Sequence, residues 1–69
     1  MTKVQTSFKL SRALDDRELK EISRLHAVYG LLAVRVQPSG DELLIDYDAS
    51  RLSREEVRGT LDQHGIPLA

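Results

Sequence analysis

Residues 31–48 determine how the rest of the chain is arranged: LLAVRVQ (31–37) is followed by PSGD (38–41) and ELLIDYD (42–48). On both sides of PSGD apolar residues alternate with other residues, and a period of two is typical of β-strands. Pro, Ser, Gly and Asp are residues that favour turns. The stretch therefore predicts a β-hairpin with its loop at 38–41. The opposite pairs are then Val36 with Leu43 and Val34 with Ile45.

Two further strands and two helices are predicted around this hairpin. Residues 4–10 alternate like a half-buried strand. Asp15 with Glu18, and Ser53 with Glu56, have the spacing of a capping box, in which two side chains satisfy free backbone N–H groups where a helix starts. Gly30 and Gly65 are placed to end the two helices. A last short strand is predicted at 66–69, at an edge of the sheet because proline lacks an N–H.

The same periodicity predicts which side chains face the core. Leu14 before the first cap and Leu19 after it are placed to pack together as a hydrophobic staple. Phe8 and Tyr47 are predicted to face the helices rather than the open face of the sheet. The buried stripes are Leu19, Ile22, Leu25, His26 and Tyr29 in the first helix, and Val57, Thr60, Leu61 and His64 in the second. The open face of the sheet is predicted to carry Lys9, Arg35, Asp46 and Asp48 as solvated charge pairs around an exposed Leu44.

The order strand, helix, strand, strand, helix, strand, with short connections, predicts a ferredoxin-like sandwich. This is an α+β fold with an antiparallel sheet of order 4-1-3-2 and both helices on one face. Residues 1–69 are predicted to form a single domain. Loops 11–15, 38–41 and 64–65 then lie at one end of the fold, and loops 26–30 and 49–53 lie at the other.

The composition excludes several classes of function. The chain has no cysteine, which excludes disulfides, thiolate metal ligands and cysteine nucleophiles. A net charge of -1, from 10 basic and 11 acidic residues, gives no field that attracts phosphate backbones, so we expect no nucleic-acid binding. No apolar run approaches the roughly 20 residues of a membrane helix, and the N-terminus lacks the apolar core of a signal peptide. We expect a cytoplasmic protein without membrane insertion.

Four segments share a pattern with a known family: GLLAVRV (30–36), LIDYD (44–48), LSREEV (52–57) and HGIPLA (64–69). They resemble the heavy-metal-associated domain of copper chaperones and metal-pumping ATPases, whose pattern is Gly-Val-x-x-Val-x-Val, Val-x-Tyr/Phe-Asp, a Ser/Thr-capped helix and a late Gly-Tyr. That family holds Cu(I) or another soft ion with Gly-Met-x-Cys-x-x-Cys in its first strand-to-helix loop. The corresponding stretch here is SRALDDR (11–17), without either cysteine or the Gly-Met. The resemblance implies the scaffold and a surface for docking a partner, without the metal site.

We therefore expect a small non-enzymatic binding module that acts through protein contacts and needs no cofactor. One candidate surface is the first loop with the histidine beside it. The other is the edge strand 31–37 and the adjoining sheet face, where unpaired backbone is available to a partner strand or to a second copy in a homodimer. The candidate residues are Ser11, Arg12, Ala13, Leu14, Asp15 and His64 at the first surface, and Arg35 and Leu44 at the second.

Other functions have less support in the residues. No Gly-rich phosphate loop is present, neither histidine has a serine and a carboxylate at a meaningful spacing, and Asp46 and Asp48 are expected to be too solvated for acid catalysis. An accessory role in metal transport or detoxification would use Asp15, Asp16 or His64. However, helix capping explains the acidic pair, and Ca²⁺ gathers six to eight oxygens. A small-molecule regulatory domain of the ACT type shares only the topology.

Overall fold

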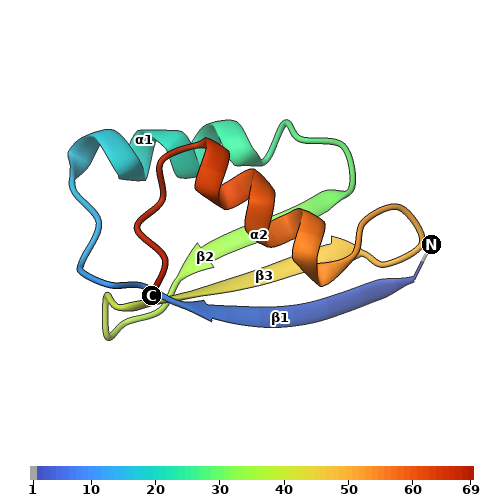
Figure 1. Ribbon diagram of the computed structural model, residues 1–69, viewed down its shortest axis with the longest axis horizontal. Coiled ribbons are helices and arrows are strands. Elements are labelled where there is room, and N and C mark those ends of the chain that lie inside the picture. The colour runs from blue at the N-terminus through green and yellow to red at the C-terminus, as the bar shows by residue number, and fades with distance from the viewer. Residues whose placement is uncertain (1) are drawn as a thin grey trace.

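The computed structural model describes residues 2–69. In chain order the elements are β1 (Lys3–Lys9), α1 (Asp16–Leu25), β2 (Leu31–Val36), β3 (Glu42–Asp48) and α2 (Arg54–Gln63). The three strands form an antiparallel sheet of order β1-β3-β2. Both helices cover the same face of this sheet (Figure 1). The predicted α+β class and the central position of the third strand are confirmed.

β2 and β3 form the hairpin that the sequence predicts. Val34 lies opposite Ile45 and Val36 lies opposite Leu43. The Gln37 N–H donates to the Glu42 carbonyl over 2.9 Å, which closes the loop at 38–41. Gly40 adopts a φ of +81° there, a conformation that a residue with a side chain rarely adopts. The pairing next to the loop is therefore the one that the turn residues and the alternation predict.

Both helices begin at the predicted capping boxes. Asp15 accepts the backbone N–H of Glu18 while the Glu18 side chain accepts the backbone N–H of Asp15, and Ser53 and Glu56 make the same pair of bonds in α2. The end of α2 is also as predicted, since Gly65 follows the cap with a φ of +75°. In contrast, α1 stops at residue 25, because the next residues form successive tight turns instead of helical bonds.

The core fills the space between the sheet and the two helices. Phe8 and Tyr47 are both buried, which confirms that they face the helices. Side chains from every element contribute to it. The buried hydrophobic residues are Phe8, Leu10, Ile22, Leu25, Leu31, Val34, Leu43, Ile45, Tyr47, Val57, Leu61 and Ile66.

The buried face of α1 differs from the predicted stripe. Glu18, Ile22 and Leu25 are buried, whereas Leu19 is 46% exposed and Tyr29 is 72% exposed. The predicted staple at Leu19 is therefore wrong. Glu18 takes the inner position because its carboxylate is held by groups of the preceding loop, and the positions four and seven residues further on follow it onto that face. Tyr29 lies beyond the last helical residue, so the helical period does not apply to it.

The predicted fourth strand does not form in the described residues. The tail makes a single antiparallel bridge, between Leu10 and Leu68. Two backbone bonds flank it: the Ser11 N–H donates to the Pro67 carbonyl over 2.8 Å, and the Ala69 N–H donates to the Lys9 carbonyl over 2.9 Å. The tail does not continue as a strand because the bond from the Leu68 N–H to the carbonyl of residue 66 bends the chain at residue 67, which has no N–H to donate to Ser11 in return.

Of the charge pairs predicted on the open face of the sheet, the one between Arg35 and Asp46 forms, and the carboxylates of this face are not solvated. Asp46 and Asp48 are each only 4% exposed. Asp46 accepts Gln5 Nε2 over 3.1 Å and Arg35 Nη2 over 3.3 Å, and Lys3 Nζ lies 3.8 Å away. The expected solvation is wrong because these side chains cover the carboxylate of Asp46, while Thr2 and Ser50 hold that of Asp48. Leu44, on the same face, was predicted to be exposed but is half-buried.

Candidate functional site

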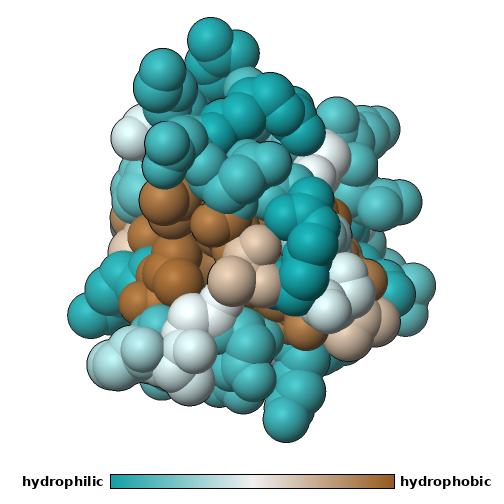
Figure 2. Space-filling view, turned by 90° about the vertical axis from the view of Figure 1, so that its left-hand side faces the viewer, coloured by the Kyte–Doolittle hydropathy of each residue, from teal (hydrophilic) through white to brown (hydrophobic). Residues whose placement is uncertain are grey.

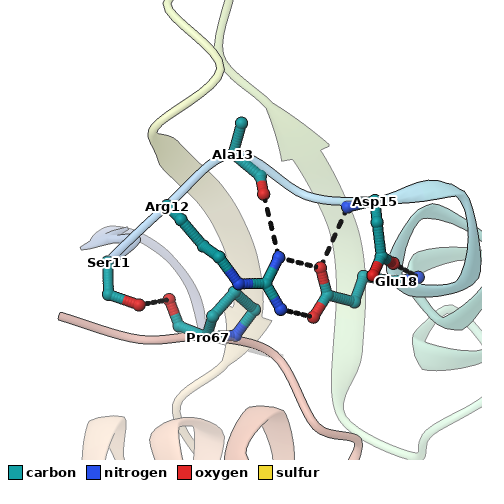
Figure 3. Close-up of polar contacts among 6 residues, drawn as sticks. All are labelled: Ser11, Arg12, Ala13, Asp15, Glu18 and Pro67. Carbon is teal, nitrogen blue, oxygen red and sulfur yellow. Dashed lines mark hydrogen bonds and ion pairs between the residues drawn. The ribbon is translucent and has the colours of Figure 1, made fainter.

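The loop between β1 and α1 is closed on itself by an ion pair. Arg12 Nη1 lies 2.8 Å from Glu18 Oε1 and Nη2 lies 2.5 Å from Oε2, so the two groups face each other fork to fork (Figure 3). Arg12 Nη1 also donates to the Ala13 carbonyl over 3.1 Å, and the Asp15 N–H donates to Glu18 Oε1 over 2.9 Å. A side chain from each end of the loop thus fixes its shape.

Glu18, in the first turn of α1, belongs to the candidate site, although the sequence predicts only a helix-capping role for it. Its side chain is 1% exposed, and hydrogen bonds from the Arg12 guanidinium, then from the Asp15 backbone, lower the pKa of Glu18 to about 2. The same bond raises the pKa of Arg12. The pairing was not predictable from spacing, because Arg12 and Glu18 are separated by a loop and do not share a helix face. The carboxylate is therefore a fixed charge that holds the loop.

His64 connects the end of α2 to the middle of α1. Its Nδ1 lies 2.9 Å from Glu21 Oε2, and Arg24 Nη1 lies 2.9 Å from the other oxygen of the same carboxylate. The hydrogen bond with His64 is the main reason why the pKa of Glu21 is lowered. The structure thus places His64 in a contact between helices, which accounts for its position on the inner face of α2.

Two of the three residues proposed as weak metal ligands, Asp15 and His64, make contacts within the fold. Asp15 Oδ1 accepts the Glu18 N–H over 2.8 Å, and His64 Nδ1 faces Glu21. Asp16 lies in the exposed first turn of α1. Within residues 2–69, no group of three or more His, Cys, Asp or Glu side chains is arranged to hold a metal ion.

The first loop and the hairpin turn meet at one end of the molecule, as predicted, and the tail joins them there. The Leu10 N–H donates to the Asp41 carbonyl over 2.7 Å, and the Ser11 hydroxyl donates to the Pro67 carbonyl over 3.2 Å. Figure 2 shows this end, where hydrophobic surface is surrounded by hydrophilic side chains. Three partly buried hydrophobic residues belong to the segments that meet here: Leu14, Val36 and Leu68.

β2 lies at the edge of the sheet, but its backbone is not free along its whole length. The Val34 N–H donates to His26 Nε2 over 3.4 Å, while His26 Nδ1 lies 3.0 Å from the Ile22 carbonyl. Both contacts are satisfied by the neutral tautomer with its proton on Nδ1. The predicted unpaired edge is therefore wrong at Val34, in the middle of the strand, and Arg35 is paired with Asp46 on the open face.

A cleft of about 500 Å³ lies at the opposite end of the molecule, and the sequence does not predict it. The turn at 26–30 forms one wall, the start of β2 continues from it, and the loop after β3 forms the other wall. It is lined by His26, Ala27, Val28, Tyr29, Gly30, Leu31, Leu32, Asp48, Ser50 and Arg51.

A buried carboxylate organises one wall of this cleft. Asp48 accepts the Ser50 hydroxyl over 2.6 Å and the backbone N–H of Ser50 and Thr2 over 3.0 and 3.1 Å, and these bonds, led by the hydroxyl, lower the pKa of Asp48 to about 2. Its other oxygen lies 3.4 Å from Arg51 Nε. The Arg51 guanidinium carbon lies 4.4 Å from the centroid of the Tyr29 ring, in a cation–π contact. Asp48 therefore holds Arg51 over the exposed aromatic ring.

Comparison of the chain with protein-family models, with curated proteins and with solved structures gives no match. Within residues 2–69, none of the helices is long and apolar enough to cross a membrane. The contacts at the two ends of the molecule are therefore the basis for a functional proposal.

Proposed function

We propose that the protein is a small non-enzymatic binding module that works by contacting another protein at the end formed by the first loop. The proposal includes the scaffold of the heavy-metal-associated domain without its metal site. The observation that carries it is the Arg12–Glu18 ion pair, which fills the loop where that family places its two cysteines. The charged groups inside the loop bind each other, so the outer surface of the loop is what remains for a partner.

The arrangement of the tail supports the ferredoxin-like part of this proposal. In a sheet of order 4-1-3-2, the fourth strand pairs with the first, and the bridge between Leu10 and Leu68 lies on that side of the sheet. We therefore propose a ferredoxin-like sandwich in which the fourth strand is reduced to this one bridge. The antiparallel direction of the bridge is the direction that this topology requires.

The surface at this end has the character of a protein interface. A hydrophobic centre within a hydrophilic rim is the common anatomy of such interfaces (Figure 2). Ala13 is exposed at the tip of the first loop, where its carbonyl is held by Arg12. The loop therefore presents a fixed shape, which lowers the entropy cost of binding.

Replacing Ala13 by Arg is expected to abolish partner capture by this surface. An unpaired charge placed in a buried contact costs about 2 kcal/mol or more, so recovery of the partner should fall by at least about tenfold. The measurement is quantitative affinity purification with tagged protein. Ala49→Arg is the matched control, because Ala49 is also exposed and lies in the loop after β3, away from the first loop. Equal recovery of every complex by the two variants would contradict the proposed surface.

Metal handling is the alternative that a direct measurement separates from protein contact. Equilibrium dialysis of the natural chain against Cu(I), Zn²⁺, Ni²⁺ and Ca²⁺ is expected to show no stoichiometric uptake, because within residues 2–69 no three His, Cys, Asp or Glu side chains are arranged around one point. Stoichiometric uptake of any of these ions would overturn the proposal.

A gain-of-function variant tests the resemblance itself. Aligned residue for residue with the seven-residue family motif, the two cysteines fall on Leu14 and Arg17, on either side of Asp15 and Asp16. The double variant Leu14→Cys/Arg17→Cys is expected to bind Cu(I) under reducing conditions, since thiolates select soft ions and a helix N-terminus favours the thiolate form. A folded double variant that binds no Cu(I) would count against the proposed scaffold.

A further inference from the structure

The cleft at 26–32 and 48–51 combines exposed hydrophobic surface with concavity. The large hydrophobic side chains that are exposed in residues 2–69 are Leu19, Tyr29 and Leu32, and two of these three line the cleft. Tyr29 is 72% exposed and Leu32 is 38% exposed. Exposed hydrophobic residues that gather at one concave place mark binding surfaces more often than single scattered ones do.

The charged group that a partner would meet in this cleft is the Arg51 guanidinium. Its side chain is 50% exposed, and its Nε contacts Asp48, which is buried beneath it. Within residues 2–69 the Arg51 guanidinium contacts Asp48 through Nε and lies over the Tyr29 ring, and neither Nη atom takes part in a hydrogen bond or an ion pair. A guanidinium held in this way is preorganised to bind a carboxylate through two parallel hydrogen bonds.

The edge of β2 beside the cleft limits what can dock there. His26 covers the Val34 N–H, so a partner strand that extended along β2 would have to displace the imidazole. The start of β2, at Leu31 and Leu32, lines the cleft itself. A short segment that ends near Val34 therefore fits this surface better than a long added strand does.

We propose that this cleft docks a short acidic segment of a partner protein. A carboxylate of the segment binds Arg51, and a neighbouring hydrophobic side chain packs on Tyr29 and Leu32. Tyrosine and arginine are the residue types that most often dominate the energy of protein interfaces. The inference rests on the proposed function in one respect: it also takes the protein to act by contacting another protein. It assigns a second surface, at the opposite end from Ala13.

The test uses a phage-displayed library of short random peptides, selected on the full chain. Enriched peptides are expected to carry Asp or Glu next to a large hydrophobic residue. Their affinity is expected to fall by at least about tenfold for Arg51→Glu and for Tyr29→Ala. Arg54→Glu is the matched control, because Arg54 also lies over an aromatic ring, Phe8, at 4.5 Å, but does not line the cleft. Arg51→Glu places a second carboxylate next to Asp48 and can disturb folding. The decisive variant is therefore Tyr29→Ala, because Tyr29 is exposed.

The inference would be overturned by the absence of any enriched peptide, by enrichment without acidic residues, or by peptides whose affinity is unchanged by Tyr29→Ala. Self-association in sedimentation that Tyr29→Ala abolishes would also overturn it, because a second copy would then be the occupant. Peptides that lose affinity with Ala13→Arg but not with Tyr29→Ala would remove the cleft and leave the proposed function standing. If Ala13→Arg does not reduce partner capture but Tyr29→Ala does reduce peptide affinity, the proposed function at the first loop is removed and the inference about the cleft stands.

Discussion

Replacing Leu25 by Ala is expected to lower the free energy of unfolding by about 3 kcal/mol, whereas replacing Leu19 by Ala changes it by less than about 0.5 kcal/mol. Leu25 is fully buried and Leu19 is 46% exposed. Both lie in α1, so the two substitutions delete the same atoms, and the gain in helix propensity from Leu to Ala is small at either position. The difference between them therefore reports mainly burial.

The size of this effect is large for a chain of 69 residues. Domains of this length have a free energy of unfolding of roughly 3 to 10 kcal/mol, so Leu25→Ala removes a substantial part of it. Urea unfolding followed by circular dichroism measures the loss as a shift of the midpoint at constant slope. Equal losses for the two variants, or a larger loss for Leu19→Ala, would mean that the helix faces the sheet as its apolar stripe predicts.

The inner face of α1 shows where prediction from the sequence stops. The hairpin and both capping boxes depend on residues that are close to each other in the sequence, and all three were predictable. The burial of Glu18 depends on Arg12 across a loop, and no local pattern indicates that a glutamate enters the core in place of a leucine. A charged residue at an inner position is uncommon unless it is paired, and the pair here is not local.

The cleft and the tail illustrate the same limit. Tyr29 fits the helical period and precedes a glycine, so the sequence predicts that it lies in the helix. However, the helix ends at Leu25, and the successive turns that follow place Tyr29 outside it. Its contact with Arg51 joins segments that meet only in the folded sheet. In the tail, Ile66 and Leu68 alternate as in a strand, yet a local bond between them ends the pairing with β1 after one bridge. The sequence identified the first loop as a candidate site, but not the cleft.

Acid is expected to destabilise the protein through Glu18 and Asp48. Both pKa values are about 2 in the folded protein, against ordinary values of 4.5 and 3.8. A carboxylate whose pKa is lowered by folding contributes stability above its unfolded pKa, and that contribution is lost as the pH falls toward the folded pKa. The melting temperature should therefore be nearly constant from neutral pH to about pH 5 and should fall steadily between about pH 5 and pH 2.

Glu18→Gln is expected to lower the melting temperature at neutral pH and to make its fall between about pH 5 and pH 2 shallower, because one of the carboxylates whose pKa is lowered by folding is gone. The variant also replaces a charged acceptor with a neutral one opposite Arg12. Glu56→Gln is the matched control: Glu56 holds the same capping position in α2 and accepts the Ser53 N–H over 3.0 Å, but it is exposed and makes no ion pair within residues 2–69. Glu56→Gln should therefore lower the melting temperature at neutral pH by less than Glu18→Gln does.

A double-mutant cycle separates the ion pair from the cap. Arg12→Ala leaves the buried Glu18 carboxylate without its cation, so this variant should be less stable than Arg12→Ala/Glu18→Gln, in which no charge is stranded. Thermal unfolding at neutral pH followed by circular dichroism measures all four corners of the cycle. Additive changes, together with equal losses for Glu18→Gln and Glu56→Gln, would mean that capping alone holds the first loop. In that case the ion pair would not be what replaces the metal site in the proposed scaffold, and the proposed function would lose its main support.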